Sequence, residues 1–184
     1  METNTLHCVR YGSTTGLWYG FIRPYNALRD EETYSLTFMP PSMVDGMAAE
    51  LGCKGKIIHS LLKHEGMDIA IDKTERVFTN KKGIRNYSTS IYSKHLLLNP
   101  TIILAFEDRE DADAAMNRSI YVGQTEYQAY PVERFDISYE DFLKLPGCEA
   151  IETDKEDPNA VFVGCNRWRN NEPMYVNLRR VSWE

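Results

Sequence analysis

Two consecutive prolines, Pro40 and Pro41, place the firmest limit on how this chain can fold. Proline lacks an amide hydrogen and clashes with the preceding helical turn, so neither residue can lie inside a helix or a central strand. Ser42 then offers a helix N-cap, and the apolar residues after it recur at helical spacing as far as Gly52, which suits a helix end. We therefore predict a helix over residues 43–51 with a buried apolar face.

The remaining elements are predicted from apolar alternation and turn residues. We expect strands at 5–11, 67–71, 75–79, 94–99, 101–106, 119–127, 160–164 and 174–181, a second helix at 56–64, and short helices at 111–116 and 139–145. Asn80-Lys81-Lys82-Gly83 is expected to form a turn, since glycine can take a positive φ. The order of strand, helix, strand, strand, short helix, strand is that of a ferredoxin-like α+β sandwich, whose topology the RNA-recognition fold shares. We expect a modified domain of this kind over residues 1–135 and a small C-terminal strand extension over residues 136–184.

Charge is unevenly distributed along the chain. The net charge is −6, which argues against a protein coated with basic surface for nucleic acid. Residues 76–95 nevertheless contain five Lys or Arg residues and no acid, whereas residues 133–157 contain nine acids. A local basic site in the middle of the chain is therefore compatible with the overall negative charge.

No cofactor or metal is expected. The four cysteines, Cys8, Cys53, Cys148 and Cys165, form no C-x-x-C pair, so we expect free thiols in a reducing compartment. No phosphate-binding Gly-Lys-Ser/Thr loop and no G-x-S-x-G motif occurs. The sequence has no apolar run long enough for a signal peptide or membrane span, and we expect a cytoplasmic protein.

Four segments, in order, resemble one known family. Pro40-Pro41-Ser42, followed by Gly46 and a helix ending at Leu51-Gly52, resembles the first helix of the CRISPR-associated Cas-five family, which belongs to the repeat-associated RNA-binding superfamily. Residues 20–25, 94–101 and 120–127 resemble further segments of that family, and the likeness covers roughly residues 18–130. Gln124 and Tyr127 depart from it, since arginine and cysteine are usual at those positions.

The resemblance implies a non-catalytic RNA-binding subunit of an antiviral ribonucleoprotein complex. Members of the family grip the 5′ repeat-derived handle of the crRNA and contact a Cas-seven family backbone subunit and a large subunit. A β-hairpin thumb, here residues 76–94, separates handle from guide. Aromatic side chains on it would stack on bases and basic ones would bind phosphates. The expected RNA-binding residues are Arg23, Tyr25, Arg76, Lys81, Lys82, Arg85, Tyr87, Tyr92 and Lys94.

Three alternatives stay open. The basic segment could be a merely solvated surface hairpin. The chain could be a metal-independent endoribonuclease that processes repeat RNA, since Lys94-His95 offers a cation and a base, although the Lys-His pair of the cleaving branch follows a later strand. It could also be a phage-borne decoy of the subunit. In the non-catalytic interpretation His95 packs at the start of a strand.

Overall fold

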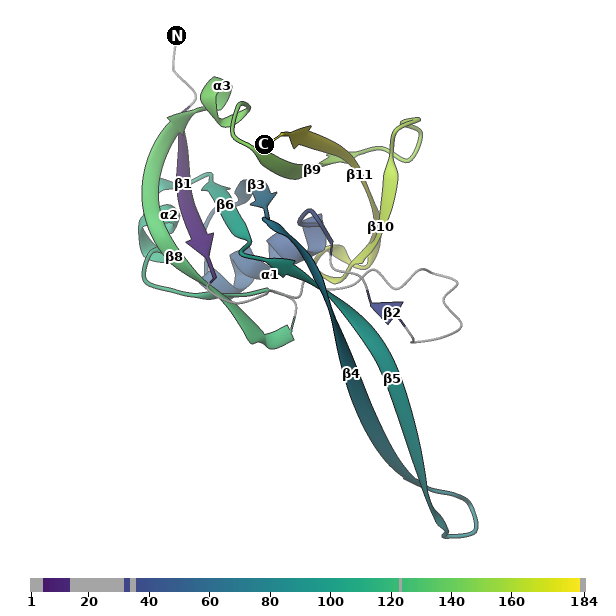
Figure 1. The fold of residues 1–184 in the computed structure, drawn as a ribbon. Coiled ribbons are helices and arrows are strands. Elements are labelled where there is room, and N and C mark those ends of the chain that lie inside the picture. Colours follow the sequence, from purple (N-terminus) through teal and green to yellow (C-terminus); the bar gives the residue numbers. More distant parts are fainter. Residues whose placement is uncertain (1–4, 14–31, 34–35, 123, 183–184) are drawn as a thin grey trace.

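The computed structural model describes residues 5–13, 32–33, 36–122 and 124–182. It shows a mixed α+β chain dominated by antiparallel strands, with few helices (Figure 1). The strands are β1 (Thr5–Gly12), β2 (Glu32–Thr33), β3 (Ile57–Lys63), β4 (Gly66–Thr79), β5 (Arg85–Leu98), β6 (Thr101–Phe106), β7 (Ile120–Val122), β8 (Gln124–Ser138), β9 (Gly147–Thr153), β10 (Val161–Asn166) and β11 (Glu172–Val181). The helices are α1 (Pro41–Leu51), α2 (Arg109–Ala115), α3 (Tyr139–Phe142) and the 3-10 turn η1 (Arg167–Arg169).

Eight strands form one sheet in the order β10-β11-β9-β3-β6-β1-β8-β7. The paired strands run antiparallel, and β1 lies between β6 and β8, with Val9 opposite Leu104 and Arg134. The predicted domain boundary at residue 135 lies within β8, and β9, β10 and β11 extend the same sheet. A smaller sheet contains β2, β5 and β4.

The main core lies between the sheet and the helices α1 and α2. Apolar side chains of β1, β3 and β6 alternate between two faces, as the pleat requires. One set packs on α1 and α2 and includes Tyr11, Leu62 and Leu104. The other set packs beneath Phe142 of α3 and includes Cys8, Leu61 and Ile103. A third cluster joins β9, β10 and β11 around Val176.

Helix α1 confirms the helix predicted from the double proline, but its start differs. The helix begins at Pro41, with Pro40 in the N-cap position, so Ser42 is not the cap. Proline is tolerated in the first turn because its missing amide hydrogen has no helical partner there. The helix ends as predicted at Gly52, whose φ of 68° is left-handed.

The helix predicted at residues 56–64 is wrong, because the chain there forms strand β3. Ser60, Leu61 and Leu62 are all buried, since β3 has core on both faces. A strand covered on both faces carries a continuous apolar run that periodicity alone cannot distinguish from a buried helix.

Candidate nucleic-acid interface

Strands β4 and β5 form a long hairpin that projects from the main sheet (Figure 1). The two strands pair without a break from Gly66 opposite Leu98 to Thr79 opposite Arg85. Fourteen residues at strand spacing correspond to an arm about 45 Å long. The sequence predicted a shorter hairpin over residues 76–94; the paired segment begins ten residues earlier.

The tip of the hairpin is closed by hydrogen bonds to Asn80. Its side-chain Oδ1 accepts from the backbone N–H of Lys82 at 2.9 Å and from that of Ile84 at 3.0 Å. The backbone N–H of Asn80 also donates to the carbonyl of Ile84 at 2.9 Å. Gly83 takes a φ of 76°, which costs glycine little. The tip is therefore an ordered turn, as the Asn-Lys-Lys-Gly motif predicts.

Three predicted phosphate ligands gather at this tip. Lys81 and Lys82 lie in the turn and Arg85 at the first position of β5, and all three are exposed. Within the described part of the chain, none of their side chains has an ion-pair partner. Tyr87 lies two residues from Arg85 and its side chain is 75% exposed. The tip thus presents three uncompensated positive charges beside one open aromatic ring.

The other predicted RNA-binding residues that the structure describes do not lie at the tip. Arg76 is in β4 opposite Ser88, and Tyr92 and Lys94 are in β5 opposite Asp72 and Ala70. Arg23 and Tyr25 lie outside the described residues.

Sequence reasoning missed an apolar row on one face of the hairpin. Alternate residues of β4, together with the residues directly opposite them on β5, share a face. This row contains Met67, Ile69, Ile71, Val77, Tyr87 and Ile91. All are exposed, with Ile71 at 78% and Ile91 at 65%. The alternation of Met67, Ile69 and Ile71 predicted the strand at 67–71, but alternation does not indicate whether the apolar face is buried or exposed.

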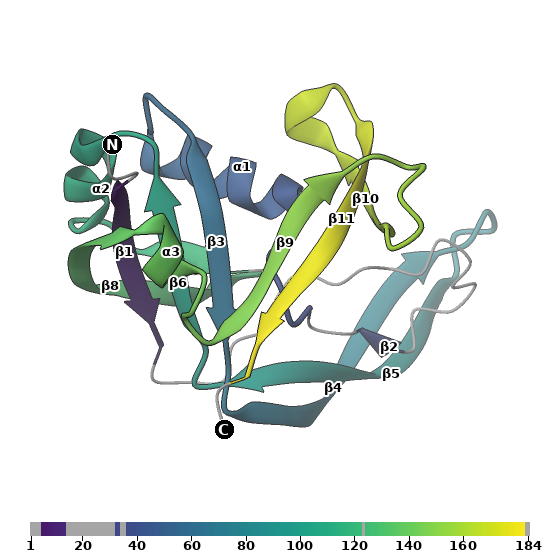
Figure 2. The same ribbon diagram turned by 90° about the horizontal axis from the view of Figure 1, so that it is seen from above.

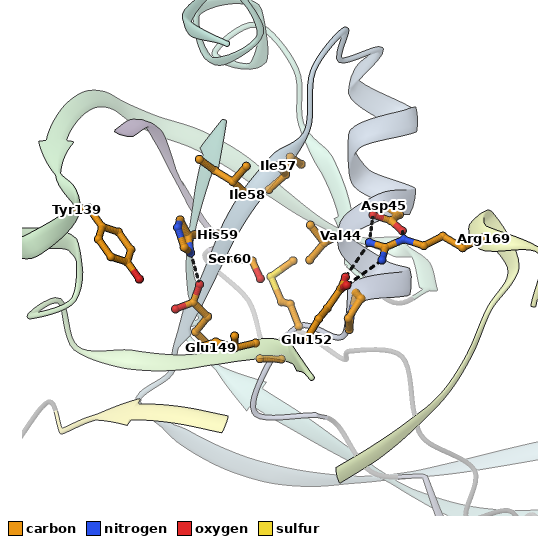
Figure 3. Close-up of a pocket in the computed structure, with 14 residues that line it drawn as sticks. Val44, Asp45, Ile57, Ile58, His59, Ser60, Tyr139, Glu149, Glu152 and Arg169 are labelled. Atoms are coloured by element: carbon orange, nitrogen blue, oxygen red, sulfur yellow. Dashed lines mark hydrogen bonds and ion pairs between the residues drawn. The ribbon is translucent and has the colours of Figure 1, made fainter. Parts of the chain in front are cut away.

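A second polar cluster lies in the main sheet, between β3 and β9 (Figure 3). His59 Nδ1 lies 2.7 Å from Glu149 Oε1, and Arg179 donates to Glu149 Oε2 from Nη2 at 2.7 Å and from Nε at 2.9 Å. The His59 ring stacks on Tyr139, with ring centroids 5.3 Å apart. Ninety residues separate His59 from Glu149 in the chain, so no local motif could indicate the pair.

Burial and hydrogen bonding act in opposite directions on the Glu149 carboxyl. Burial alone would raise its pKa, but hydrogen bonds from His59 and Arg179 outweigh that effect, and the pKa lies below its usual range. The carboxylate therefore stays charged and holds the His59 ring in place. Within the described residues, His59 Nε2 has no hydrogen-bond partner, so this nitrogen is available to a ligand.

Two of the four free cysteines have unreactive thiols. Cys8 and Cys148 are buried, and burial raises the pKa of the Cys8 thiol to about 12 and that of the Cys148 thiol above its usual range. A thiol with a raised pKa forms little thiolate and reacts slowly. Cys53 is half-buried and Cys165 is exposed, and all four are free. In the part of the chain that the structure describes, no three His, Cys, Asp or Glu residues are grouped to hold a metal ion.

The described helices are also too short or too polar for any of them to span a membrane. A scan against protein-family models finds no match for this chain, and a search of the curated proteins finds none either.

Proposed function

We propose that this chain is a non-catalytic RNA-binding subunit of a CRISPR RNA-guided complex, which holds the 5′ repeat-derived handle of the crRNA. The observation that carries the proposal is the exposed tip of the β4–β5 hairpin, with Lys81, Lys82 and Arg85 beside Tyr87. Basic side chains that track phosphates and aromatic rings that stack on bases are the usual means of binding single-stranded RNA.

The strand order supports a ferredoxin-like domain with a thumb. Strands β3, β6, β1 and β8 are neighbours in that order and pair antiparallel, α1 follows β1, and α2 follows β6. This is the arrangement expected of a β-α-β-β-α-β unit. In this proposal the hairpin inserted between β3 and β6 serves as the thumb. The same complex would supply a Cas-seven family backbone subunit and a large subunit as partners.

The first test is binding of labelled repeat RNA in EDTA, alone and with a Cas-seven family subunit, over a range of salt concentrations. Changing Lys81, Lys82 and Arg85 together to Ala should weaken binding and lower the salt slope by about 2, since each contact to single-stranded RNA contributes about 0.7. The matched control changes Arg109, Lys144 and Lys155 to Ala. These three basic residues are exposed and lie outside the hairpin, so the control removes the same charge.

The outcomes separate the proposal from its alternatives. If the two triple variants show the same dependence of RNA binding on salt, the hairpin tip does not contact the RNA. A specific cut in the RNA on a denaturing gel, lost in a His95→Ala variant, would instead make the chain a repeat-processing endoribonuclease. Intact RNA that shifts on a native gel supports the handle-binding function.

A further inference from the structure

Strands β3 and β9 are neighbours in the sheet but are joined at only one position. Leu62 pairs with Cys148, and no further pair follows. On its other edge β3 remains paired with β6 as far as Ile57, and β9 remains paired with β11 as far as Thr153. Figure 2 shows the two strands diverging from this point. Within the described residues, their facing edges therefore offer backbone groups that no strand uses.

The space between the two edges is hollow and continues past His59. One hollow, of about 290 Å³, is lined by residues of β3, β9 and α1, among them Ser60, Ala150 and Val44. A second, of about 310 Å³, lies on the other side of β3, where residues of β1 and β6 and Glu107 line it. Ile58, His59 and Tyr139 line both. The two hollows adjoin at these three residues, and together we call them the groove; Figure 3 shows the first of them.

The groove is apolar along its floor and acidic at its ends. Ile58 and Ile151 are 44% and 45% exposed. Asp45 and Glu152 line one end and Glu107 the other. Among the described lining residues Arg169 is the only arginine or lysine, and it is already bonded to Asp45 at 2.8 Å and to Glu152 at 2.9 Å. Such a lining disfavours phosphate and favours a positively charged ligand.

We propose that this groove binds an extended basic segment of a partner protein by strand addition between β3 and β9. Unpaired strand edges supply main-chain hydrogen bonds, and the alternating side chains of an added strand select by shape and charge. Small apolar residues would pack on Ile58 and Ile151. Lys or Arg would approach Glu107 at one end and, at the other, the Asp45–Glu152–Arg169 cluster, which keeps one net negative charge. The hairpin tip has the opposite charge and lies elsewhere, so this site is separate from the proposed RNA interface.

The test uses a fluorescein-labelled octapeptide of alternating Val and Lys, acetylated and amidated at its ends. Titration into the whole chain at low salt should give saturable anisotropy, and amide NMR shifts should concentrate in β3 and β9. A peptide with Glu in place of Lys should bind at least about tenfold more weakly, because its charge is repelled. A Val-Lys peptide N-methylated at alternate residues should also bind about tenfold more weakly, since it lacks the amide hydrogens that pair with one edge.

Two variants locate the site. Ile58→Arg places bulk and positive charge in both hollows and should weaken the Val-Lys peptide about tenfold or more. Its control, Ile84→Arg, makes the same change at an isoleucine of the hairpin turn that is 56% exposed, and should leave the affinity unchanged. Thermal unfolding of both variants checks that they fold. If Ile58→Arg does not fold, Glu107→Gln should weaken the peptide about threefold, because it removes one attracting charge.

Three results would overturn the proposal. One is the absence of saturable binding up to about 1 mM peptide, an affinity too weak for a specific site. Another is equal binding of the N-methylated peptide, which would exclude strand addition. The third is displacement of the peptide by a ten-nucleotide uridine RNA with shifts in β3 and β9, which would make the groove a nucleic-acid site.

Discussion

Gly147 shows how one residue can control the contact between the two halves of the main sheet. It begins β9, next to the single pair between β9 and β3, with a φ of 141° that side chains rarely adopt. A Cβ atom there would lie 2.8 Å from Leu61 Cγ and 2.9 Å from the carbonyl oxygen of Leu62. Only glycine allows β9 to approach β3 this closely.

Gly147→Ala should therefore destabilise the fold by about 3 kcal/mol, since backbone strain adds to overpacking of a core residue. Gly83→Ala is the matched control. Gly83 also has a positive φ, of 76°, but nothing lies within 4 Å of its added Cβ. It should cost only about 1 kcal/mol. Urea unfolding measures both, and equal losses would show that the close approach to Leu61 does not matter.

The ion pairs of Glu149 predict an acid-sensitive contribution to stability. The folded-state pKa of Glu149 lies below its usual range, because the hydrogen bonds from His59 and Arg179 exceed the cost of burial. A lowered pKa stabilises the fold above the unfolded value of about 4.3, and this contribution disappears as the pH falls through the folded value.

Glu149→Gln should cost roughly 3 kcal/mol at pH 7, because it leaves the Arg179 charge unpaired in a half-buried site. The difference in unfolding free energy from the unmodified protein should shrink as the pH falls below about 4.5. Denaturant unfolding between pH 3 and pH 7 gives the comparison, with the exposed Glu172→Gln as control. A difference that does not change with pH would contradict the assigned role of the charge.

At the scale of elements, the hairpin differs from the central strands of the main sheet in how far its apolar side chains are exposed. The apolar row on β4 and β5 is open to solvent, whereas β1, β3 and β6 bury most of their apolar side chains. Burial is what makes an apolar side chain stabilising, at about 25 cal/mol per Å² removed from water. The row therefore contributes little to the stability of the isolated chain.

Changing Ile69, Ile71 and Ile91 together to Thr should leave the melting temperature within about 2 °C, since threonine also favours strands and little apolar area is lost. The variant should also scatter less light at high concentration, because an exposed apolar patch promotes association. Calorimetry and static light scattering measure the two effects. A large drop in melting temperature would mean that the row packs against the rest of the chain.

The elements that could be predicted from the sequence are those set by residues close together in the chain. The double proline, Gly52 and the Asn-Lys-Lys-Gly turn act through backbone constraints within a few residues, and the structure has the expected helix and turn there. Strand β9 and most of β8 were missed, because their polar residues alternate weakly and their positions depend on distant partners such as β1 and β11. The same dependence on distant partners explains why residues 56–64 were predicted as a helix but form β3.

The candidate sites divide in the same way. Lys81, Lys82 and Arg85 are close together in the chain, and their clustering at the tip follows from the turn. His59, Glu149 and Arg179 come from three distant strands and meet only because β9 lies between β3 and β11. Charge composition can indicate the first kind of site, whereas only the sheet order reveals the second.

For the whole molecule, the arrangement predicts that the arm can be removed without unfolding the body. Replacing residues 70–94 by Asn-Gly would keep the pair of Ile69 with His95 and close it with a two-residue hairpin turn. The melting temperature should change by a few degrees at most, while RNA binding falls to the nonspecific level. Calorimetry and the repeat-RNA titration test both points. Loss of folding would show that the arm supports the core.

The central position of β1 has a consequence for the order of events during synthesis. Strand β1 pairs with β8, whose last residue, Ser138, comes about 130 residues after Thr5. At 5–20 residues per second the ribosome needs roughly 7–27 s to make the intervening chain. Throughout that time the nascent chain carries an apolar strand with at least one edge unpaired. Such an edge favours aggregation, so the yield of native protein should depend on how soon β8 is completed as well as on final stability.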